Sequence, residues 1–274
     1  MSKKAKPLRV GKVSIGGKRP AFILGPCVIE SEKFAWRMAK KIAEICAAEK
    51  VDFIFKASYD KANRTSVRSF RGIGVRDGCE ILSCIGRELK IPVTTDVHSP
   101  EEAEIAGKKI DMLQIPAFLC RQTDLLLAAA ETGRAINVKK GQFLAPWDVR
   151  NIAEKLVAFG NEKFCFTERG TTFGYSNLVA DMRSLYWIRE AGYRVIFDAT
   201  HSVQWPGGAG DATSGDSALA PVLARAAMAA GCDGIFMEVH EKPARALSDG
   251  PSQIPLKNLP KYLRMLKAIH VAVS

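Results

Sequence analysis

Short apolar runs recur along the chain, and each is followed by a polar loop and then by an amphipathic segment. Apolar runs of four to eight residues bounded by turn residues are typical of buried strands, and apolar positions at helical spacing are typical of helices on a core. The unit occurs eight times, with its apolar runs at 21–26, 52–56, 92–96, 112–117, 135–139, 163–168, 194–198 and 234–238. Eight strand–helix units in about 250 residues predict an α/β fold, a (β/α)8 TIM barrel.

Capping residues support helices between these runs. Ser31 precedes apolar positions at helical spacing, and the sequence Ser99-Pro100-Glu101-Glu102 is a capping box with proline at the first helical position. Pro146 predicts the start of a helix that ends at Gly160. Further helices are expected at 123–132, 177–190, 217–230 and 256–268, with glycine C-caps at Gly160, Gly192 and Gly231.

A doubly wound sheet is the alternative fold, but the first unit lacks a GxGxxG sequence and the chain has no P-loop sequence. No change of composition marks a second domain. We therefore expect a single catalytic barrel domain at 21–274, preceded by an N-terminal extension at 1–20. A weak alternation at 10–15 suggests a small hairpin within that extension.

The apolar runs, the cysteine pattern and the net charge indicate which classes of protein the chain can belong to. The 274 residues are 47% hydrophobic and 25% charged, with no apolar run of 18 residues and no apolar segment near the N-terminus. We expect neither a membrane span nor a secretory signal. Seven cysteines without a CxxC pair predict reduced thiols in the cytoplasm. The formal net charge of +11 fits either nucleic acid or small polyanionic substrates as partners.

The stretch 56–66 gathers cations directly after the second strand. Lysine acts as a point charge and arginine can hold a phosphate with two hydrogen bonds, so such a loop suits an anion with several oxygens. A solvated loop of mixed charge is the alternative interpretation. The cations are Lys56, Lys61 and Arg64, and the polar residues between and beside them are Ser58, Asn63 and Thr65.

In a (β/α)8 barrel, active sites form where the strands end. Lysines, arginines and residues able to bind metal stand at these ends, so the barrel prediction brings them to one mouth. In chain order they are Cys27, Lys56, Ser58, Asp96, His98, Gln114, Arg121, Lys139, Lys140, Glu168, Arg169, Asp198, His201, Glu238 and His240.

Four residues from different units form a candidate metal site: Cys27, His201, Glu238 and Asp249. A thiolate, an imidazole and carboxylates suit a divalent ion such as Zn²⁺, Fe²⁺ or Mn²⁺. No local spacing supports the set, and only the barrel brings its members together. The alternatives are a small buried thiol, a core histidine and surface carboxylates.

Lys139 and Lys140 are adjacent at a strand end, so their side chains point to opposite faces and only one enters the barrel. A buried lysine needs an anion or a lowered pKa. Arg169 is followed by glycine-containing backbone and also suits a phosphate. The glycine-rich stretch 206–211 is either a lid or an ordinary flexible loop.

Several longer motifs resemble the 3-deoxy-D-manno-octulosonate 8-phosphate synthase family, and the similarity runs from about residue 21 to residue 270. The motifs are Phe55-Lys56-Ala57-Ser58, Asp60-Lys61-Ala62-Asn63-Arg64, Gln114-Ile115-Pro116-Ala117-Phe118-Leu119, Arg121-Gln122-Thr123-Asp124-Leu125, Asn137-Val138-Lys139-Lys140, Phe173-Gly174-Tyr175 and Asp198-Ala199-Thr200-His201. This resemblance implies a barrel enzyme of lipopolysaccharide sugar synthesis. It would join phosphoenolpyruvate to D-arabinose 5-phosphate, as a homotetramer and without a nucleotide cofactor.

The resemblance also implies roles for individual residues. Phosphoenolpyruvate would bind Lys56, Lys61, Lys139 and Arg169, with Ser58 and Gln114 nearby. Arabinose 5-phosphate would contact Asn63, Arg64, Thr65 and Asp96, and in the family the arginine and its neighbouring hydroxyl reach an adjacent subunit's site. We predict that the catalytic residues are Lys61, Asn63, Asp96, Lys139 and His201.

Family members are metal-dependent or metal-independent, and the two types differ at the position of Cys27, where independent members carry asparagine. Cys27 and the sequence Thr200-His201-Ser202-Val203-Gln204 resemble the metal-dependent type. The sequence Ser248-Asp249-Gly250-Pro251-Ser252 departs toward the independent type, with serine where that pattern usually begins with cysteine. We predict metal dependence, because the thiolate completes the ligand set.

Two alternative functions remain open from the sequence. The chain could be the related 3-deoxy-D-arabino-heptulosonate 7-phosphate synthase, which uses erythrose 4-phosphate, although the run from Asp60 to Arg64 disfavours it. A basic nucleic-acid-binding protein would also explain the net charge. Cations at the strand ends, in place of an outer basic face, disfavour that alternative.

Overall fold

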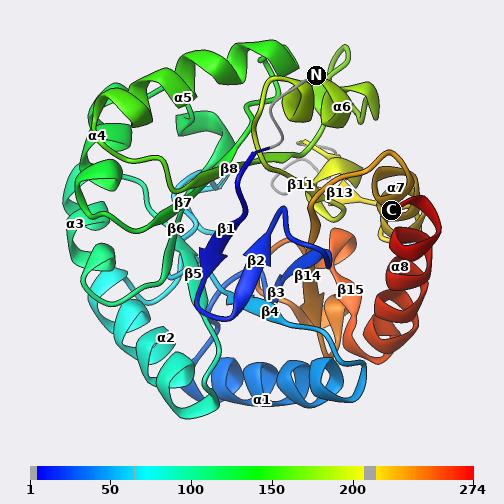
Figure 1. The fold of residues 1–274 in the computed structure, drawn as a ribbon. Helices are drawn as coiled ribbons and strands as arrows, with labels where there is room; N and C mark the ends of the chain where they lie inside the picture. Colours follow the sequence, from blue (N-terminus) through cyan, green and yellow to red (C-terminus); the bar gives the residue numbers. More distant parts are fainter. Residues whose placement is uncertain (1–4, 65, 207–213) are drawn as a thin grey trace.

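The computed structural model describes residues 5–64, 66–206 and 214–274. Eight parallel strands form a closed barrel, and helices surround it (Figure 1). The barrel closes because β11 pairs with β14 and β14 pairs with β3. The eight strands are β3 (Ala21–Gly25), β4 (Phe53–Lys56), β5 (Val93–Asp96), β6 (Met112–Ile115), β7 (Ala135–Lys139), β8 (Phe164–Glu168), β11 (Val195–Asp198) and β14 (Gly234–His240). The predicted (β/α)8 barrel is therefore confirmed.

The outer layer consists of eight α-helices in the described part of the chain. Two predicted N-caps are present, since Ser31 Oγ accepts the backbone N–H of Phe34 and Ser99 Oγ accepts that of Glu102. Positive φ angles at Gly160, Gly192 and Gly231 confirm the predicted C-caps. The helices are α1 (Glu32–Ala48), α2 (Val75–Leu89), α3 (Pro100–Gly107), α4 (Thr123–Glu131), α5 (Val149–Ala158), α6 (Arg183–Glu190), α7 (Ala220–Ala229) and α8 (Leu259–Val273).

Some helix boundaries differ from the prediction. The segment 177–190 is helical only from Arg183, because β10 (Leu178–Val179) first pairs with β9 (Thr171–Thr172). Proline at 146 starts a 3-10 turn, η2 (Pro146–Asp148), and α5 follows it. The segment 256–268 divides into η6 (Leu256–Asn258) and α8. Some residues that the hydrophobic periodicity assigns to helices therefore form short strands and 3-10 turns.

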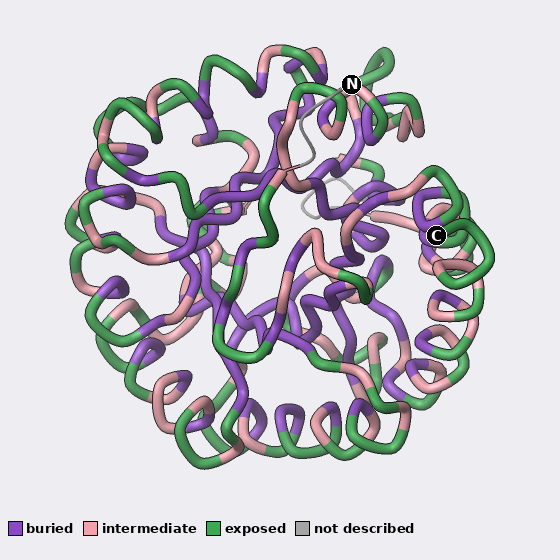
Figure 2. The backbone as a smooth tube through the Cα atoms, in the orientation of Figure 1, coloured by how far each residue is buried: buried purple, intermediate pink, exposed green. Residues whose placement is uncertain are grey.

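The barrel interior has two layers. The lower layer is an apolar cluster, and it includes the N-terminal hairpin of β1 (Leu8–Val10) and β2 (Val13–Ile15), which confirms the predicted hairpin. This hairpin lies across one end of the barrel in Figure 1, and buried residues alternate with less buried ones along its two strands, as in the burial colouring of Figure 2. Alternate residues on each strand point inward, so the polar upper layer lies two residues further along the strands. The lower layer comprises Leu8, Val10, Val13, Ile15, Ala21, Ile23, Ile54, Met112, Ala135, Cys165, Ile196 and Phe236.

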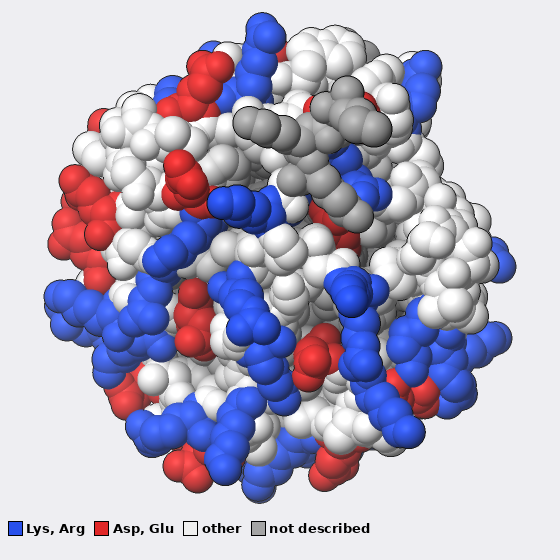
Figure 3. Space-filling model, in the orientation of Figure 1, with Lys and Arg blue, Asp and Glu red and all other residues white. Residues whose placement is uncertain are grey.

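Charge is not confined to the mouth. Figure 3 views the molecule from the side of the hairpin and shows lysines and arginines over much of that face, mixed with carboxylates. The location of cations alone therefore does not exclude nucleic acid, contrary to the sequence argument. No helix in the described residues is long and apolar enough to cross a membrane.

Candidate active site

A cleft of about 330 Å³ opens at the C-terminal ends of the barrel strands. Polar and charged side chains from most of the strands line it, as expected for the catalytic face of this fold. The lining residues include Lys56, Lys61, Asn63, Arg64, Asp96, His98, Gln114, Phe118, Lys139, Gln142, Arg169, His201, Gln204 and Asp249.

Lys56 lines this cleft and is almost completely buried. Its Nζ donates to Glu238 Oε1 at 2.8 Å and to the carbonyl oxygen of Cys27 at 3.1 Å, and it lies 3.6 Å from Asp96 Oδ2. Burial alone would raise the pKa values of both carboxyl groups, but the lysines outweigh it and hold these pKa values well below their usual range. Glu238 and Asp96 are therefore ionised at neutral pH.

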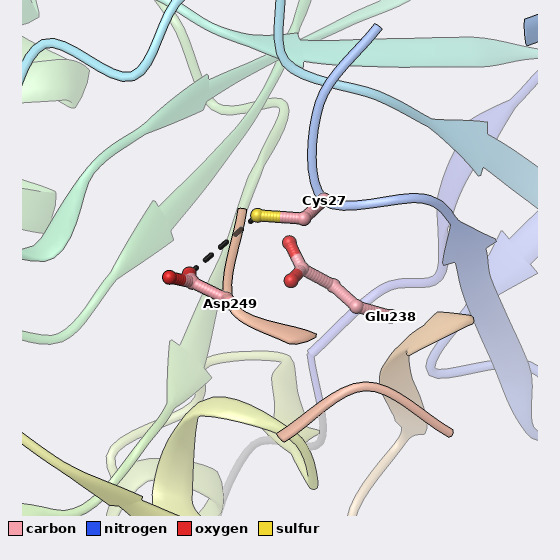
Figure 4. Close-up of side chains that lie close together, drawn as sticks. All are labelled: Cys27, Glu238 and Asp249. Atoms are coloured by element: carbon pink, nitrogen blue, oxygen red, sulfur yellow. Dashed lines mark hydrogen bonds between the residues drawn. The ribbon is translucent and has the colours of Figure 1, made fainter. Parts of the chain in front are cut away.

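Cys27, Glu238 and Asp249 present ligand atoms that all lie within 4.8 Å of one another (Figure 4). The Sγ of Cys27 lies 2.9 Å from Ser248 Oγ and 3.5 Å from Asp249 Oδ2. Burial, and then the two neighbouring carboxylates, raise the pKa of the Cys27 thiol well above its usual value. Glu238 Oε2 is buried and has no hydrogen-bond partner among the described residues. A buried anionic oxygen without a partner suits a bound cation.

His201 adds an imidazole to this group. Its Nδ1 lies 2.8 Å from Asp198 Oδ2, and its backbone N–H donates to Asp198 Oδ1 at 2.9 Å. Nε2 therefore faces the carboxylates, 3.6 Å from Glu238 Oε1 and 3.9 Å from Asp249 Oδ2. The structure thus brings the four predicted metal ligands into one region. A carboxylate behind a histidine is the usual support for a metal-binding imidazole.

Lys139 and Lys140 point to opposite faces of β7, as the strand alternation predicts. Lys139 Nζ enters the barrel, where it contacts Asp198 and lies 3.5 Å from the centre of the Phe236 ring. Burial lowers the pKa of Lys139, and Asp198 partly opposes that effect. Lys140 Nζ is enclosed on the other face, 3.0 Å from the carbonyl oxygen of Leu144 and 3.5 Å from Glu168 Oε2.

Arg169 is buried at the cleft wall, and burial lowers its pKa. One terminal nitrogen, Nη2, donates to Gln204 Oε1 at 3.0 Å. The other, Nη1, is buried and has no partner among the described residues. Gln204 also donates to Asp249 Oδ2 at 3.2 Å, so one amide links the arginine to the carboxylate.

The loop after β4 brings the predicted substrate residues to the cleft. Lys61 Nζ lies 3.9 Å from Glu238 Oε1, and nearby anionic groups raise the pKa of Lys61 although burial opposes them. Arg64 contacts the same chain, donating to the carbonyl oxygen of Leu247 at 2.9 Å and lying 3.6 Å from Asp249 Oδ1. Thr65, predicted to contact the sugar phosphate, lies outside the described residues.

Asp96 stands at the centre of a hydrogen-bonded group formed by three predicted residues. Ser58 Oγ donates to Asp96 Oδ2, and Gln114 Nε2 donates to Asp96 Oδ1 at 2.6 Å. Ser58 and Gln114 are both buried. Ser58 and Gln114 each donate a hydrogen bond to the Asp96 carboxylate, and these two hydrogen bonds fix the side chain of Asp96 at the cleft.

Eight residues expected at the mouth are not part of the cleft lining in the described part of the chain: Cys27, Ser58, Arg121, Lys140, Glu168, Asp198, Glu238 and His240. Of these, Cys27, Ser58, Asp198 and Glu238 contact residues that do line the cleft. Arg121 is exposed, Glu168 pairs with Lys140, and His240 packs against Phe34 outside the barrel. The glycine-rich stretch 206–211, interpreted above as either a lid or a flexible loop, lies outside the described residues from residue 207 onward.

The sequence placed Asp198 at the mouth but did not predict that Asp198, Gln204 and Ser248 contact His201, Arg169 and Cys27. Strand alternation was the available signal for Asp198, which lies two residues after the inward-facing Ile196. Gln204 begins the two-residue strand β12 (Gln204–Trp205), which is too short to show a period, and Ser248 lies in a loop.

The fold and the site define a (β/α)8-barrel protein with a catalytic-face cleft lined by cations. A family model described as the DAHP synthetase I family matches residues 2–274, so the chain belongs to this family. The chain is 58% identical over 266 residues to the "2-dehydro-3-deoxyphosphooctonate aldolase" of Pelobacter propionicus, covering 97% of this chain and 98% of that protein. It is 55% identical over 270 residues to the protein of the same name from Geotalea uraniireducens, covering 98% and 99%.

Proposed function

We propose that this protein condenses phosphoenolpyruvate with D-arabinose 5-phosphate and water, giving 3-deoxy-D-manno-octulosonate 8-phosphate and inorganic phosphate. The observation that carries the proposal is the convergence of Lys56, Lys61, Lys139 and Arg169 at one cleft. The names of the similar proteins support an octulosonate product over the heptulosonate alternative. No structural observation favours the nucleic-acid alternative.

Phosphoenolpyruvate binds the lysines and Arg169 in this proposal, with Ser58 and Gln114 beneath it. The free Nη1 of Arg169 supports this placement, because a buried guanidinium nitrogen without a partner is costly until an anion accepts its hydrogen bond. The sugar phosphate contacts Asn63, Arg64, Thr65 and Asp96. The residues of this set that the structure describes line the same cleft.

A divalent metal ion binds Cys27, His201, Glu238 and Asp249 in the proposed enzyme. The unpartnered Glu238 Oε2 and the mixed thiol, imidazole and carboxylate donors fit such an ion. Because the pKa of the Cys27 thiol is raised, binding displaces its proton and is favoured at higher pH. The ion supplies Lewis-acid charge stabilisation at the site.

Two phosphorylated anions repel each other, and the cations at the cleft offset this repulsion in the proposed enzyme. In the proposed reaction a bond forms between C3 of phosphoenolpyruvate and the aldehyde carbon, and water adds at C2. The C2–O bond to phosphate then breaks, and inorganic phosphate leaves. Lys139 either donates a proton or stabilises the developing charge, and burial lowers its pKa toward a value suited to proton transfer. Asp96 and Asn63 orient the aldose.

We also propose that the enzyme is a cytoplasmic homotetramer. Exposed aromatic side chains support association, since Phe118, Phe143 and Phe173 are each more than half exposed and Phe118 lines the cleft. All seven cysteines are described and are free thiols, which supports a reducing compartment.

A phosphate-release assay with both substrates tests the proposed function. We expect release with arabinose 5-phosphate, little with erythrose 4-phosphate, loss of activity with a chelator, and recovery with Mn²⁺ or Zn²⁺. The variant Cys27→Asn should lose metal dependence and retain turnover. Equal activity with erythrose 4-phosphate would contradict the substrate assignment. Full activity of metal-stripped wild type, or a Cys27→Asn variant that still binds metal but is inactive, would contradict the metal assignment.

A further inference from the structure

Four polar side chains form a hydrogen-bonded row that leads from the cleft lining, at Asp96 and Gln114, into the barrel. Two of them, Asn137 and Thr167, have no role in the proposed chemistry. Thr167 Oγ1 donates to Asn137 Oδ1 at 2.6 Å, and Asn137 Nδ2 donates to Gln114 Oε1 at 3.0 Å. Gln114 Nε2 then donates to Asp96 Oδ1 at 2.6 Å. All four residues are buried, with Asp96 the most exposed at 8%.

Strand register places this row. Asp96 on β5 lies directly beside Gln114 on β6, which lies beside Asn137 on β7. Thr167 follows Cys165, the strand partner of Asn137, by two residues and so points to the same face. The row therefore crosses four neighbouring strands inside the barrel.

Only one orientation of the Gln114 and Asn137 amide groups satisfies every hydrogen bond in the row. The carboxylate of Asp96 is ionised and can only accept, so Gln114 must turn its NH₂ group toward it. Gln114 Oε1 then faces Asn137, which must present its own NH₂ group and leave Oδ1 to accept. Thr167 supplies that last hydrogen bond, and the thiol of Cys165, 3.6 Å away, is a much weaker donor.

We propose that Asn137 and Thr167 are positioning residues that orient the amide of Gln114 and thereby hold Asp96 for the aldose substrate. The proposal rests on the function proposed above, in which Asp96 contacts arabinose 5-phosphate. Loss of the Thr167 hydroxyl removes the donor that fixes Asn137. A reversed Asn137 amide then places its oxygen against Gln114 Oε1, and this repulsion displaces Gln114 and with it Asp96.

Matched threonine variants test this proposal. Thr167→Val removes the hydroxyl with little change of shape, whereas Thr167→Ser keeps it. Thr95→Val is the control, because Thr95 is equally buried and its hydroxyl has no partner among the described residues. We expect Thr167→Val to raise the KM for arabinose 5-phosphate about fivefold to tenfold, which is the loss expected for one buried hydrogen bond. The KM for phosphoenolpyruvate should change less, and Thr167→Ser and Thr95→Val should stay near wild type.

Two results would overturn the proposal: wild-type kinetics in Thr167→Val, or equal impairment in Thr167→Ser and Thr167→Val. Asn137→Asp is a second variant, since it keeps the shape but removes the donor to Gln114, and it should raise the same KM further. Thermal unfolding without substrate gives an independent readout, in which Thr167→Val should lower Tm and Thr95→Val should not. An inactive wild type would refute the proposed function, whereas equal Tm values for Thr167→Val and Thr95→Val would refute the row's orientation.

Discussion

Asp198 Oδ2 lies 2.8 Å from His201 Nδ1, and this contact leaves Nε2 as the imidazole nitrogen that faces Glu238 and Asp249. Asp198 also accepts the backbone N–H of His201 and contacts Lys139. The pKa of Asp198 is held well below its usual value because His201 and Lys139 outweigh the effect of burial. A fixed anion behind the imidazole makes Nε2 a better ligand.

Asp198→Asn should therefore weaken divalent-metal binding by about 10-fold to 100-fold, the range found when a carboxylate behind a histidine ligand is changed. Competition with a coloured chelator measures the Kd for Mn²⁺. Asp181→Asn is the matched control, since Asp181 pairs with Arg183 on the surface and should leave metal binding unchanged. If Asp198→Asn bound metal as tightly as wild type, the Asp198 carboxylate would not be strengthening His201 as a metal ligand.

Strand periodicity predicted the barrel and most of its mouth, because both depend on local patterns. The inward face repeats every two residues, so Lys139 rather than Lys140 reaches the cleft, and Lys56 lies two residues beyond the buried Ile54. Partners from distant strands were not predictable in this way. Asn137 lies beside Gln114 only because of the strand register, and no spacing along the chain encodes that pairing.

The loops limited the prediction further. The sequence suggests a capping box at Ser99, but the carboxylate of Glu102 instead accepts hydrogen bonds from the Tyr59 hydroxyl and the backbone of His98. Which donors bond to the Glu102 carboxylate depends on where the loop after β4 places Tyr59. Helix α6 likewise starts late because a two-residue strand pair forms first, which depends on hydrogen bonds that hydrophobic periodicity does not report.

Glu102 should make stability depend on acidic pH. Burial opposes its ionisation, but hydrogen bonds from His98 and Tyr59 prevail and lower its pKa from 4.5 to about 2. A folded-state pKa below the unfolded value gives stability that is present above about pH 4.5 and is lost as pH falls toward 2. Wild type should therefore lose roughly 2 kcal/mol more than Glu102→Gln on acidification from pH 5 to pH 2.5.

Urea unfolding at a series of pH values measures that difference. Glu104→Gln is the control, because Glu104 lies on the same helix and is exposed. It should follow the wild-type pH dependence. If Glu102→Gln also followed wild type, the hydrogen bonds to Glu102 would not be stabilising its ionised form.

Lys140 should be a major contributor to stability, although it does not line the cleft. Its Nζ bonds the carbonyl oxygens of Gly141 and Leu144 and pairs with the buried Glu168. Lys140→Met removes the lysine that pairs with that carboxylate and leaves it the hydrogen bond from the backbone N–H of Gly170. The change should cost roughly 3–5 kcal/mol in the free energy of unfolding. Adding Glu168→Gln should recover part of the loss, because it removes the stranded charge.

Lys155→Met is the matched control for this experiment. Lys155 also bonds a backbone carbonyl, that of Arg121, but at an exposed site, so its loss should cost less than about 1 kcal/mol. Denaturant unfolding compares the variants. A double variant no more stable than Lys140→Met would argue that the lost hydrogen bonds, not the stranded charge, dominate the cost.

Gly25 permits close contact between two strands at the base of the site. A Cβ atom there would lie 1.8 Å from the backbone oxygen of Lys56, so Gly25→Ala must push β3 away from β4. We expect a loss of roughly 3 kcal/mol of stability, as for a severe overpacking change, together with reduced metal binding because Cys27 lies only two residues further along the chain. Gly133→Ala is the control that introduces backbone strain without a steric clash. Gly133 has a φ of +66°, but nothing lies within 4 Å of its Cβ position. This variant should cost only about 1 kcal/mol and leave metal binding intact. Equal losses in both variants would show that backbone conformation, rather than strand contact, makes Gly25 necessary.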